Sequence, residues 1–318
     1  MTQSQLDLIK KMDWDYLIIL DACRYDYFEK VYSEYFQGNV KKVLSPGNWT
    51  IKWLKSVWGN KKYSNIIYIS GNPYINSKGL LRECDAKKHF YKIIDVWDFG
   101  WDKKSNTTHP EKINEVAQKI ISRYTEKKVI IHYMQPHAPY ISEEAMKLKE
   151  ALGKKSIKRK IFIQLKKIFP SKIRRKLGIT MELFLFQNKF EKVLYTVGLK
   201  IPDIELLDVL GIEGIKKAYE ENLRFVLKYV KELVEFIPSG KIVITADHGE
   251  LLGEDGKWFH PADCWHPKLL EVPWLEIDKG RKETEGESEG KKEEEEKEYS
   301  EKDEEIIKER LRALGYLE

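Results

Sequence analysis

Two segments of the sequence end an apolar run on side chains that can bind a divalent cation. In IVITADHGELLGE the run is followed by Asp247, His248 and Glu250, and in LIILDACRYD it is followed by Asp21. Adjacent carboxylate and imidazole groups can reach one cation, and an ionised carboxylate after a buried run is costly without such a partner. The alternatives are a polar loop with a surface histidine, and an Asp21 side chain that caps the following helix.

A hydroxyl group stands where a nucleophile could be activated. LSPGNWT predicts a turn, because serine, proline, glycine and asparagine favour turns, and Thr50 then begins an amphipathic helix. The N–H groups and the dipole at a helix N-terminus favour anions, and a metal could lower the pKa of the hydroxyl. An ordinary helix cap is the alternative for Thr50, and Ser45 is the competing hydroxyl.

Three histidines lie beside prolines, which restrict the direction of the imidazole. His137 stands between two prolines in MQPHAPY, and His260 and His266 each precede a proline in WFHPADCWHP. Such a histidine can protonate a leaving group or bind an ester oxygen, and the alternative in each case is a histidine packed in a turn. Asp85 and His89 have the spacing of metal ligands on a helix, but they follow no strand, so we expect no site there.

Short apolar runs alternate with helical patterns along the chain. Runs of the length of buried strands cover Tyr16–Leu20, Ile66–Ser70, Val129–Tyr133, Lys241–Thr245 and Val272–Ile277. Helical patterns cover Asp26–Tyr35, Ile51–Trp58, Glu111–Tyr124 and Ile215–Phe236. This alternation predicts an α/β fold whose mostly parallel sheet has helices on both faces. Ligands bind such sheets beyond the carboxyl ends of the strands, where Asp21 and Asp247 stand.

The composition suits a core large enough for one α/β domain. The chain has 318 residues, of which 42% are hydrophobic, and a net charge of +5. Its cysteines, Cys23, Cys84 and Cys264, match no zinc or redox motif, and their odd number argues against a disulfide framework. The first residues lack the apolar stretch of a signal peptide, and no segment has about 18 consecutive apolar residues. We therefore expect a soluble, cytoplasmic protein.

Two charged regions interrupt the alternation. The stretch from Lys147 to Lys200 is strongly basic, and within residues 157–176 apolar side chains share one helical face, which suits contact with an anionic membrane. Residues 279–304 are acidic and of low complexity, which predicts disorder. The expected organisation is a catalytic domain over residues 1–278 with a basic helical insertion at about 145–205, then the acidic segment, and a C-terminal helix over residues 305–318.

The order of these groups resembles the sulfatase-like branch of the alkaline phosphatase superfamily. A strand ending on Asp21, a hydroxyl at a helix start, Pro-His-x-Pro-Tyr, Asp-His-Gly-Glu and a late histidine follow one another as in that branch. Tyr219 and Asn222 in AYEENLRFV resemble its helix before the Asp-His-Gly strand, and IIKERLRALGYLE resembles its closing helix. The resemblance covers most of residues 14–277 and implies an α/β/α sandwich with a metal at the strand ends.

The resemblance also implies roles for individual residues. The family's metal ligands correspond to three residues at strand ends: Asp21, Asp247 and His248. Thr50 corresponds to the nucleophile, which also touches the metal. His137 corresponds to a histidine that contacts the substrate or leaving group, and His260 to a histidine near the leaving group or a second metal.

The sequence departs from true sulfatases in several ways. Those enzymes make formylglycine within Cys/Ser-x-Pro-x-Arg, and no cysteine here begins that pattern, while Ser45 is directly followed by proline. The family's Asp-Asp pair is Asp-Ala at Asp21, which disfavours calcium, and aspartate with histidine favours zinc or manganese. The Asp-x-x-x-His of two-zinc members is replaced by Gln-Pro-His ending at His137, so we expect one ion, with a second as the alternative.

Together the residues and the resemblance predict a metal-dependent hydrolase of phosphate or sulfate esters, with Thr50 as nucleophile and a covalent intermediate. Arg24 would stabilise the equatorial oxygens, unless it is a surface residue, and His137 or His260 would protonate the leaving group. A second hypothesis is transfer of a phosphoryl-linked headgroup to a glycan or lipid at a membrane surface. A third is a non-catalytic protein that binds anionic ligands. Nucleic acid is not expected, because aromatic residues are sparse in the basic segment.

Overall fold

The computed structural model describes residues 2–59, 61–78, 89–143, 146, 201–281 and 301–313. The chain divides into a larger unit of Met1–Tyr140, Tyr219–Leu251 and Phe259–Glu318, and a smaller unit of Ile141–Ala218 and Leu252–Trp258. Every predicted site residue belongs to the larger unit. Most of the predicted basic insertion, with its segment 157–176, lies outside the described residues, as do residues 282–300 of the predicted acidic segment.

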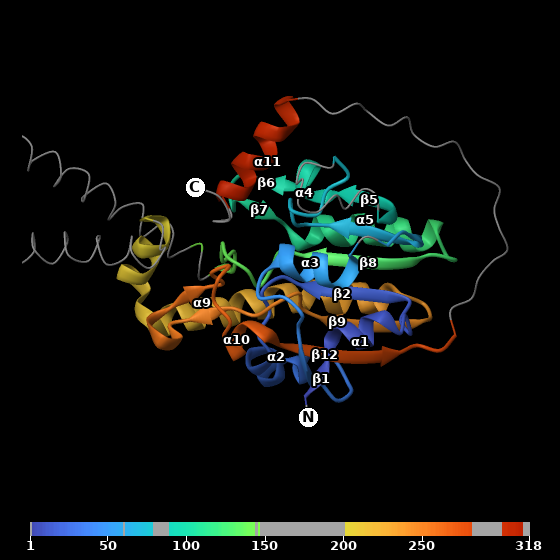
Figure 1. Ribbon diagram of the computed structural model, residues 1–318, viewed down its shortest axis with the longest axis horizontal. Coiled ribbons are helices and arrows are strands. Elements are labelled where there is room, and N and C mark those ends of the chain that lie inside the picture. The colour runs from blue at the N-terminus through green and yellow to red at the C-terminus, as the bar shows by residue number, and fades with distance from the viewer. Residues whose placement is uncertain are drawn as a thin grey trace, which may run out of the picture. The chain divides into compact units, whose positions relative to one another are not determined.

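An eight-stranded sheet forms the centre of the larger unit (Figure 1). Its strands follow the order β1-β3-β12-β9-β2-β8-β4-β5. Their bounds are Gln3–Ser4 for β1, Tyr16–Leu20 for β2, Lys41–Leu44 for β3, Tyr63–Ser70 for β4, Phe90–Asp95 for β5, Lys128–Tyr133 for β8, Lys241–Thr245 for β9 and Glu271–Asp278 for β12. Short strands outside this sheet are Trp101–Asp102 (β6), Thr107–Thr108 (β7), Leu251–Leu252 (β10) and Trp258–Phe259 (β11).

The sheet is mostly parallel, as the sequence predicts. β2 pairs in parallel with β8 and β9, and β4 pairs in parallel with β5 and β8. β12 is the exception and runs antiparallel to β3 and β9. The five predicted strands are β2, β4, β8, β9 and β12. The sequence does not predict β3 and β5, because most of their residues are exposed or half-buried and so form no apolar run.

Helices flank the sheet. In Figure 1, α3 (Thr50–Trp58) lies in front of the sheet, and the part of α9 (Ile201–Phe236) from Tyr219 onward lies behind it. The other helices are Gln5–Lys10 (α1), Tyr25–Val31 (α2), Val96–Phe99 (α4), Pro110–Arg123 (α5), Pro267–Leu270 (α10) and Glu301–Ala313 (α11), with 3-10 turns at Tyr32–Glu34 and Glu254–Gly256. The predicted helices are present, but α9 begins at Ile201 rather than near Ile215, and α11 begins at Glu301.

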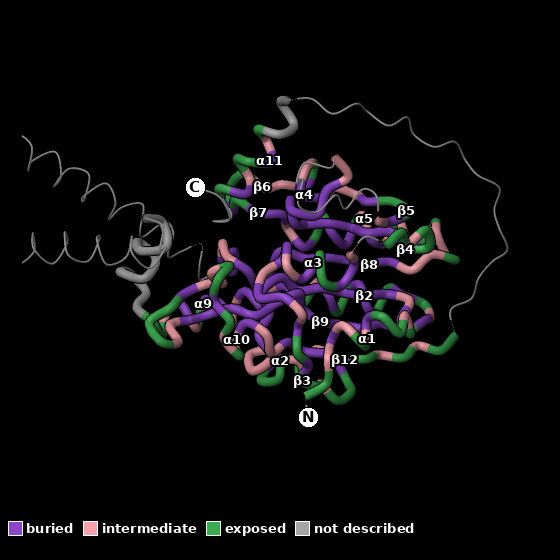
Figure 2. Tube along the Cα trace, viewed as in Figure 1, coloured by how far each residue is buried: buried purple, intermediate pink, exposed green. Residues whose placement is uncertain are grey.

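The core holds the central strands firmly in place. All five residues of β2 are buried, and β8 and β9 are buried after their first residue, which Figure 2 shows as purple along the middle of the sheet. Each fully buried isoleucine, leucine or valine side chain in these strands stabilises the fold by roughly 1.5–3 kcal/mol. The carboxyl ends of the strands therefore have fixed positions, and side chains that follow them can be placed accurately.

The C-terminal helix α11 packs near the start of α3. Ile307 and Leu311 lie in one apolar cluster with Ile51, Tyr74 and Trp97. The predicted closing helix thus packs against residues of α3, of α4 and of the turn after β4.

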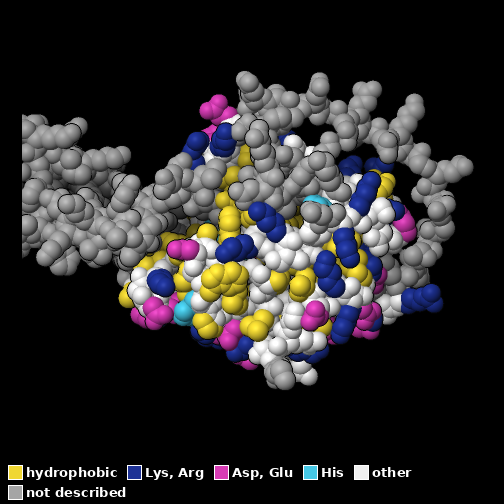
Figure 3. All heavy atoms as spheres, in the orientation of Figure 1, with side chains coloured by type: hydrophobic (Ala, Val, Ile, Leu, Met, Phe, Trp, Pro, Cys, Tyr) yellow, Lys and Arg dark blue, Asp and Glu magenta, His cyan; other side chains and the backbone are white. Residues whose placement is uncertain are grey.

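The described surface carries charges of both signs. On the face drawn in Figure 3, basic, acidic and apolar side chains are interspersed. Within the part of the chain that the structure describes, no helix combines the length and the apolar character that a membrane span needs.

Candidate metal centre and active site

The carboxyl ends of four strands bring the predicted residues together. Asp21 follows β2, Asp247 follows β9, and His137 lies in the loop after β8, while Asn72 follows the neighbouring strand β4. Asp21 and Asp247 are both 0% exposed. Buried carboxylates of this kind are costly unless a cation or several hydrogen bonds compensate the charge, so each of them needs a cation or hydrogen-bond donors close by.

Asp21, Asp247 and His248 form a compact cluster. Each offers one ligand atom, and the three atoms lie within 4.8 Å of one another. His248 Nε2 is 3.6 Å from Asp21 Oδ1 and 3.4 Å from Asp247 Oδ2. Thr50 Oγ1 lies 2.8 Å from Asp247 Oδ2 and 3.4 Å from His248 Nε2. All four residues predicted to hold the metal are therefore adjacent, and we call them the metal cluster.

The backbone fixes the direction of two of these ligands. The N–H groups of Ala22 and His248 donate to Asp247 Oδ1 over 3.2 and 2.9 Å. His248 Nδ1 lies 2.7 Å from the carbonyl oxygen of Gly249, so the proton on Nδ1 donates to it and Nε2 faces the cluster. Ala22 has a φ of 57°, which is unusual for a residue with a side chain and turns its N–H toward Asp247.

Gly249 is required by close packing behind His248. A Cβ atom at Gly249 would lie 2.0 Å from the carbonyl oxygen of Lys268. The N–H of Gly249 donates to the carbonyl oxygen of Leu269 over 2.8 Å. The loop after β9 is therefore pressed against α10, and no larger residue fits in the Asp-His-Gly turn without a shift of the backbone.

Thr50 is the first residue of α3 but does not cap it. The N-cap is Trp49, which makes no side-chain cap hydrogen bond, and the Thr50 hydroxyl instead donates to Asp247 Oδ2. The alternative of an ordinary helix cap therefore does not describe Thr50. Ser45, the competing hydroxyl, hydrogen-bonds with the carbonyl oxygens of Gly47 and Asp247, so it faces the backbone.

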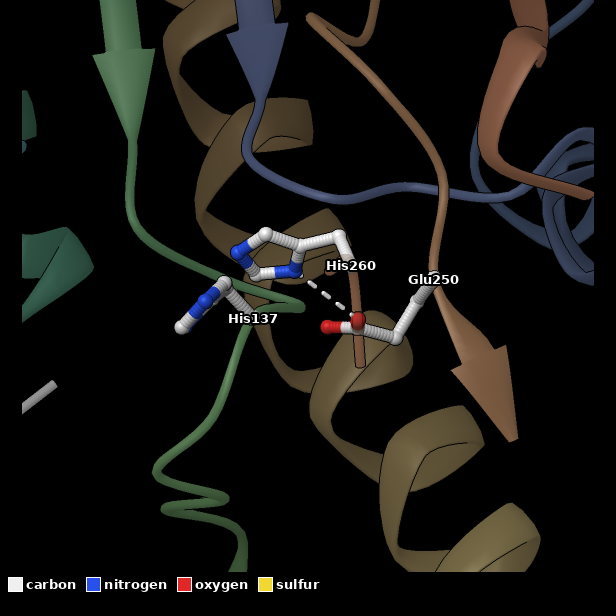
Figure 4. Close-up of side chains that lie close together, drawn as sticks. All are labelled: His137, Glu250 and His260. Atoms are coloured by element: carbon white, nitrogen blue, oxygen red, sulfur yellow. Dashed lines mark hydrogen bonds and ion pairs between the residues drawn. The ribbon is translucent and has the colours of Figure 1, made fainter. Parts of the chain in front are cut away.

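Figure 4 shows a second cluster of titratable side chains. His137, Glu250 and His260 offer ligand atoms within 4.8 Å of one another. His260 Nδ1 is 2.9 Å from Glu250 Oε1, while Glu250 Oε2 is buried without a hydrogen-bond partner among the described residues. The ring centroid of His260 lies 4.5 Å from that of His248 and 5.0 Å from that of His137, so His260 connects the two clusters.

The charges of the metal cluster stabilise one another. Burial alone would raise the pKa of Asp21, but the nearby rings of His132, His137 and His248 hold that pKa well below its usual range. Burial alone would lower the pKa of His248, but Asp247 and Asp21 raise it. Both aspartates thus raise the pKa of the same imidazole, as expected for groups arranged around one cationic centre.

The pKa shifts in the second cluster favour neutral imidazoles and a protonated carboxyl group. Burial raises the pKa of Glu250 to about 7. Burial and the neighbouring His248 lower the pKa of His260 to about 3, and burial lowers the pKa of His137. A buried carboxyl group with a pKa near neutrality can exchange a proton under physiological conditions, which is the property of a general acid or base.

Arg24 is buried rather than on the surface, but it contacts other groups than expected. It is 3% exposed, and its Nε and Nη2 donate to the carboxylate of Asp26 over 2.9 and 2.8 Å. Its Nη1 donates to the carbonyl oxygen of Glu250 over 3.2 Å. These contacts position the loop that carries Glu250; a direct contact of Arg24 with an ester remains a prediction.

Three buried residues at the site were not predicted from the sequence to have functional roles. Glu250 was named with Asp247 and His248 after the apolar run but was assigned no role of its own. Asn72 lies in a short turn, and His132 lies within β8 and looks like an ordinary core position. His266, in contrast, has the role of a turn residue, because its Nδ1 accepts from the N–H of Lys268 and caps α10. Asp85 lies outside the described residues.

Comparisons with known proteins agree with this architecture. No family model matches the sequence, and no curated protein matches it. The solved structure of the integral membrane protein EptA, a lipooligosaccharide phosphoethanolamine transferase from Neisseria meningitidis, is similar with a TM-score of 0.50 and 11% identity. The likeness covers 83% of this chain and 47% of that one, so the chain spans about half the length of EptA.

Two further solved structures are similar at lower scores. The C-terminal periplasmic domain of EptC from Escherichia coli in complex with zinc has a TM-score of 0.48 and 11% identity, with 83% of this chain and 72% of that chain covered. A candidate sulfatase from Bacteroides thetaiotaomicron has a TM-score of 0.46 and 10% identity, with 85% and 66% covered.

These comparisons correct one expectation and confirm another. The predicted cytoplasmic location is contradicted, because the similar EptA structure is described as that of an integral membrane protein. That prediction rested on the cysteines and on the apparent lack of a leader, and neither feature determines the compartment. The predicted fold class, however, is confirmed by the sheet topology and the likeness to EptA. The chain therefore has the predicted alkaline-phosphatase-like α/β/α fold, and its likeness to EptA is a likeness of fold.

Proposed function

We propose that this protein is a metal-dependent transferase that moves a substituted phosphoryl group from an anionic ester, through Thr50, to an alcohol acceptor. The observation that carries the proposal is the position of the Thr50 hydroxyl, which donates to Asp247 Oδ2 over 2.8 Å inside the buried metal cluster. A hydroxyl held among metal ligands meets the requirement for an activated nucleophile.

The side chains of the metal cluster fit a divalent cation. Two carboxylates, an imidazole and a hydroxyl face a common centre, and this mixture suits zinc or manganese better than calcium, which takes about six to eight oxygen ligands. We propose one ion held by Asp21, Thr50, Asp247 and His248. When bound, the ion would lower the pKa of the Thr50 hydroxyl and offset the negative charge of the ester. The second cluster is the place where a second ion would bind.

The chain's own groups account for the proton transfers. Thr50 Oγ1 attacks phosphorus, and its proton leaves along the hydrogen bond to Asp247. The pair of Glu250 and His260 holds a proton near neutral pH, because burial raises the pKa of Glu250 to about 7, and can protonate the departing ester oxygen. In the second half, an acceptor alcohol gives its proton to this pair and attacks phosphorus. The bond from phosphorus to Thr50 Oγ1 breaks, and Thr50 takes back its proton along the hydrogen bond to Asp247.

Transfer and hydrolysis differ only in what releases the Thr50 intermediate. The likeness to EptA, which is described as a phosphoethanolamine transferase, supports transfer and a glycan- or lipid-linked substrate. Hydrolysis of a phosphate or sulfate ester is the second candidate, because water can attack the same intermediate. The metal and Thr50 have the same roles in both reactions.

The proposal is tested by product analysis in the presence of an acceptor. The full chain, loaded with zinc, is incubated with a fluorescent phosphatidylethanolamine, with bis(p-nitrophenyl) phosphate and with p-nitrophenyl sulfate, each with and without a soluble alcohol. We expect turnover of the phosphodiesters and a transfer product that increases with alcohol concentration. Products of hydrolysis alone, at a rate unaffected by alcohol, would favour the hydrolase; no turnover of any ester would contradict both.

A further inference from the structure

The second oxygen of the Asp21 carboxylate has its own set of buried contacts. Asn72 Nδ2 donates to Asp21 Oδ2 over 2.6 Å, and His132 Nε2 lies 3.4 Å from the same oxygen. Asp21, Asn72 and His132 are each 0% exposed. The contacts come from β4 and β8, on the side of β2 opposite to β9, which carries Asp247. Oδ2 thus contacts Asn72 and His132, while Oδ1 lies 3.6 Å from His248 Nε2 in the metal cluster.

The orientation of the His132 ring is fixed by Tyr68. The Tyr68 hydroxyl lies 2.8 Å from His132 Nδ1, and both residues are fully buried. His132 Nε2 has no hydrogen-bond partner among the described residues and faces the Asp21 carboxylate. A proton on Nε2 is favourable beside that negative charge, whereas a lone pair there would be repelled. With a proton on Nε2 directed at Asp21, Nδ1 accepts from the Tyr68 hydroxyl.

We propose that Tyr68 and His132, together with Asn72, are positioning residues that hold Asp21 as a one-oxygen ligand of the metal. This inference rests on the proposed function, because it assigns Asp21 to a metal centre. By engaging Oδ2, the three side chains keep that oxygen away from the metal and present Oδ1 to it. Partners of this kind commonly set the orientation of a ligand and affect metal affinity by about 10–100-fold.

The same arrangement at the other ligands makes the inference specific. Asp247 has Oδ1 hydrogen-bonded to two backbone N–H groups, and His248 has Nδ1 bonded to a backbone carbonyl oxygen. With Asp21 restrained by Asn72 and His132, each of these three ligands presents one atom, and Thr50 adds one more. Four single-atom ligands match the coordination that zinc prefers and fall short of the number that calcium requires. Tyr68 and His132 therefore contribute to the choice of metal.

The test compares metal affinity in variants of the full chain. His132→Leu removes the contact, His132→Gln restores an N–H donor near Asp21, and Tyr68→Phe removes only the hydroxyl that orients the ring. Zinc dissociation constants are measured by competition with a chromophoric chelator, and the Co²⁺-loaded proteins are compared by visible absorption. We expect zinc affinity to fall about 10–100-fold in His132→Leu and by less in Tyr68→Phe, and to recover in part in His132→Gln. We expect the Co²⁺ spectrum to change in His132→Leu and in Tyr68→Phe.

Tyr133→Phe is the matched control. Tyr133 lies on β8, the strand that carries His132, and its buried hydroxyl donates to Asn114 Oδ1 on α5. The variant therefore reports the cost of a lost core hydrogen bond alone. Unchanged zinc affinity in His132→Leu and Tyr68→Phe beside a wild type that binds zinc, or an equal loss in Tyr133→Phe, would overturn the inference but not the proposed function. If the wild type bound no divalent metal, both would fail.

Discussion

Thr50 and Asp247 stand 197 positions apart in the chain, yet the hydroxyl of Thr50 donates to Oδ2 of Asp247 over 2.8 Å. The contact joins the first residue of α3 to the loop after β9. Because backbone N–H groups hold the other oxygen of Asp247, the Thr50 hydroxyl has a rigid partner. One aspartate thus both positions the proposed nucleophile and offers a ligand to the metal that would activate it.

Loss of metal should follow loss of one cluster carboxylate. Asp247→Asn keeps the shape of the side chain but removes its charge, so we expect bound zinc to fall from about one ion per chain to a small fraction of that, with loss of turnover. Metal content is measured by elemental analysis after gel filtration. Asp95→Asn, which alters a partly buried aspartate bonded to Ser77, is the control and should retain the metal. A metal-free Asp247→Asn variant with full activity would contradict the metal centre.

Protonation of the leaving group should depend on His260. In His260→Gln we expect turnover to fall about 10²–10⁴-fold for esters with alkyl leaving groups, which need a proton, and far less for p-nitrophenyl esters. The measurement is the ratio of rates for the two ester types. His266→Gln is the control, because His266 caps α10 through Lys268. An equal loss for both ester types would mean that His260 does not assist the leaving group.

Acid should weaken the fold through Asp26. Burial opposes the negative charge of Asp26, but hydrogen bonds from Arg24 and Lys268 lower its pKa from the usual 3.8 to about 2. A carboxylate whose pKa is lowered by folding stabilises the protein at any pH above its pKa in the unfolded chain. That contribution is lost as the pH falls toward its pKa in the folded protein. Asp26→Asn should therefore destabilise the protein at pH 7, by about 1 kcal/mol because the pair is partly exposed.

The difference in the free energy of unfolding between wild type and Asp26→Asn should become smaller as the pH falls from about 5 toward 2. Denaturant unfolding at several pH values measures it. Asp13→Asn, which alters an exposed ion pair with Lys241, should change little at any pH. A difference between wild type and Asp26→Asn that does not depend on pH would show that Asp26 acts through packing.

The sequence predicts much of this site because the chemistry follows buried strands. The apolar runs before Asp21 and Asp247 are strong signs of central parallel strands, and the carboxyl ends of such strands meet at one edge. Thr50 is predictable from the turn before it and the helix after it. The position of His260 near His248 was expected because His260 follows the Asp-His-Gly loop closely in the chain, and also from the family resemblance.

Other features depend on tertiary contacts that leave no local pattern. His132 reads as a core residue of β8, and its contact with Asp21 arises only when β8 pairs with β2. Arg24 donates to Asp26 and to the backbone of the loop at Glu250. An arginine at this place in the sequence therefore does not by itself distinguish a substrate contact from a structural one. β3 and β5 lack a continuous apolar run, and therefore their sequences resemble loops.

The identity of the nucleophile is tested most directly by locating the covalent intermediate. Zinc-loaded protein is mixed with bis(p-nitrophenyl) phosphate, quenched in acid, digested and analysed by mass spectrometry. We expect the phosphoryl adduct on the peptide that contains Thr50, its absence in Thr50→Ala, and a fall in turnover of at least about a hundredfold in that variant, with little change in Ser45→Ala. An adduct on Ser45, or normal turnover in Thr50→Ala, would contradict the account.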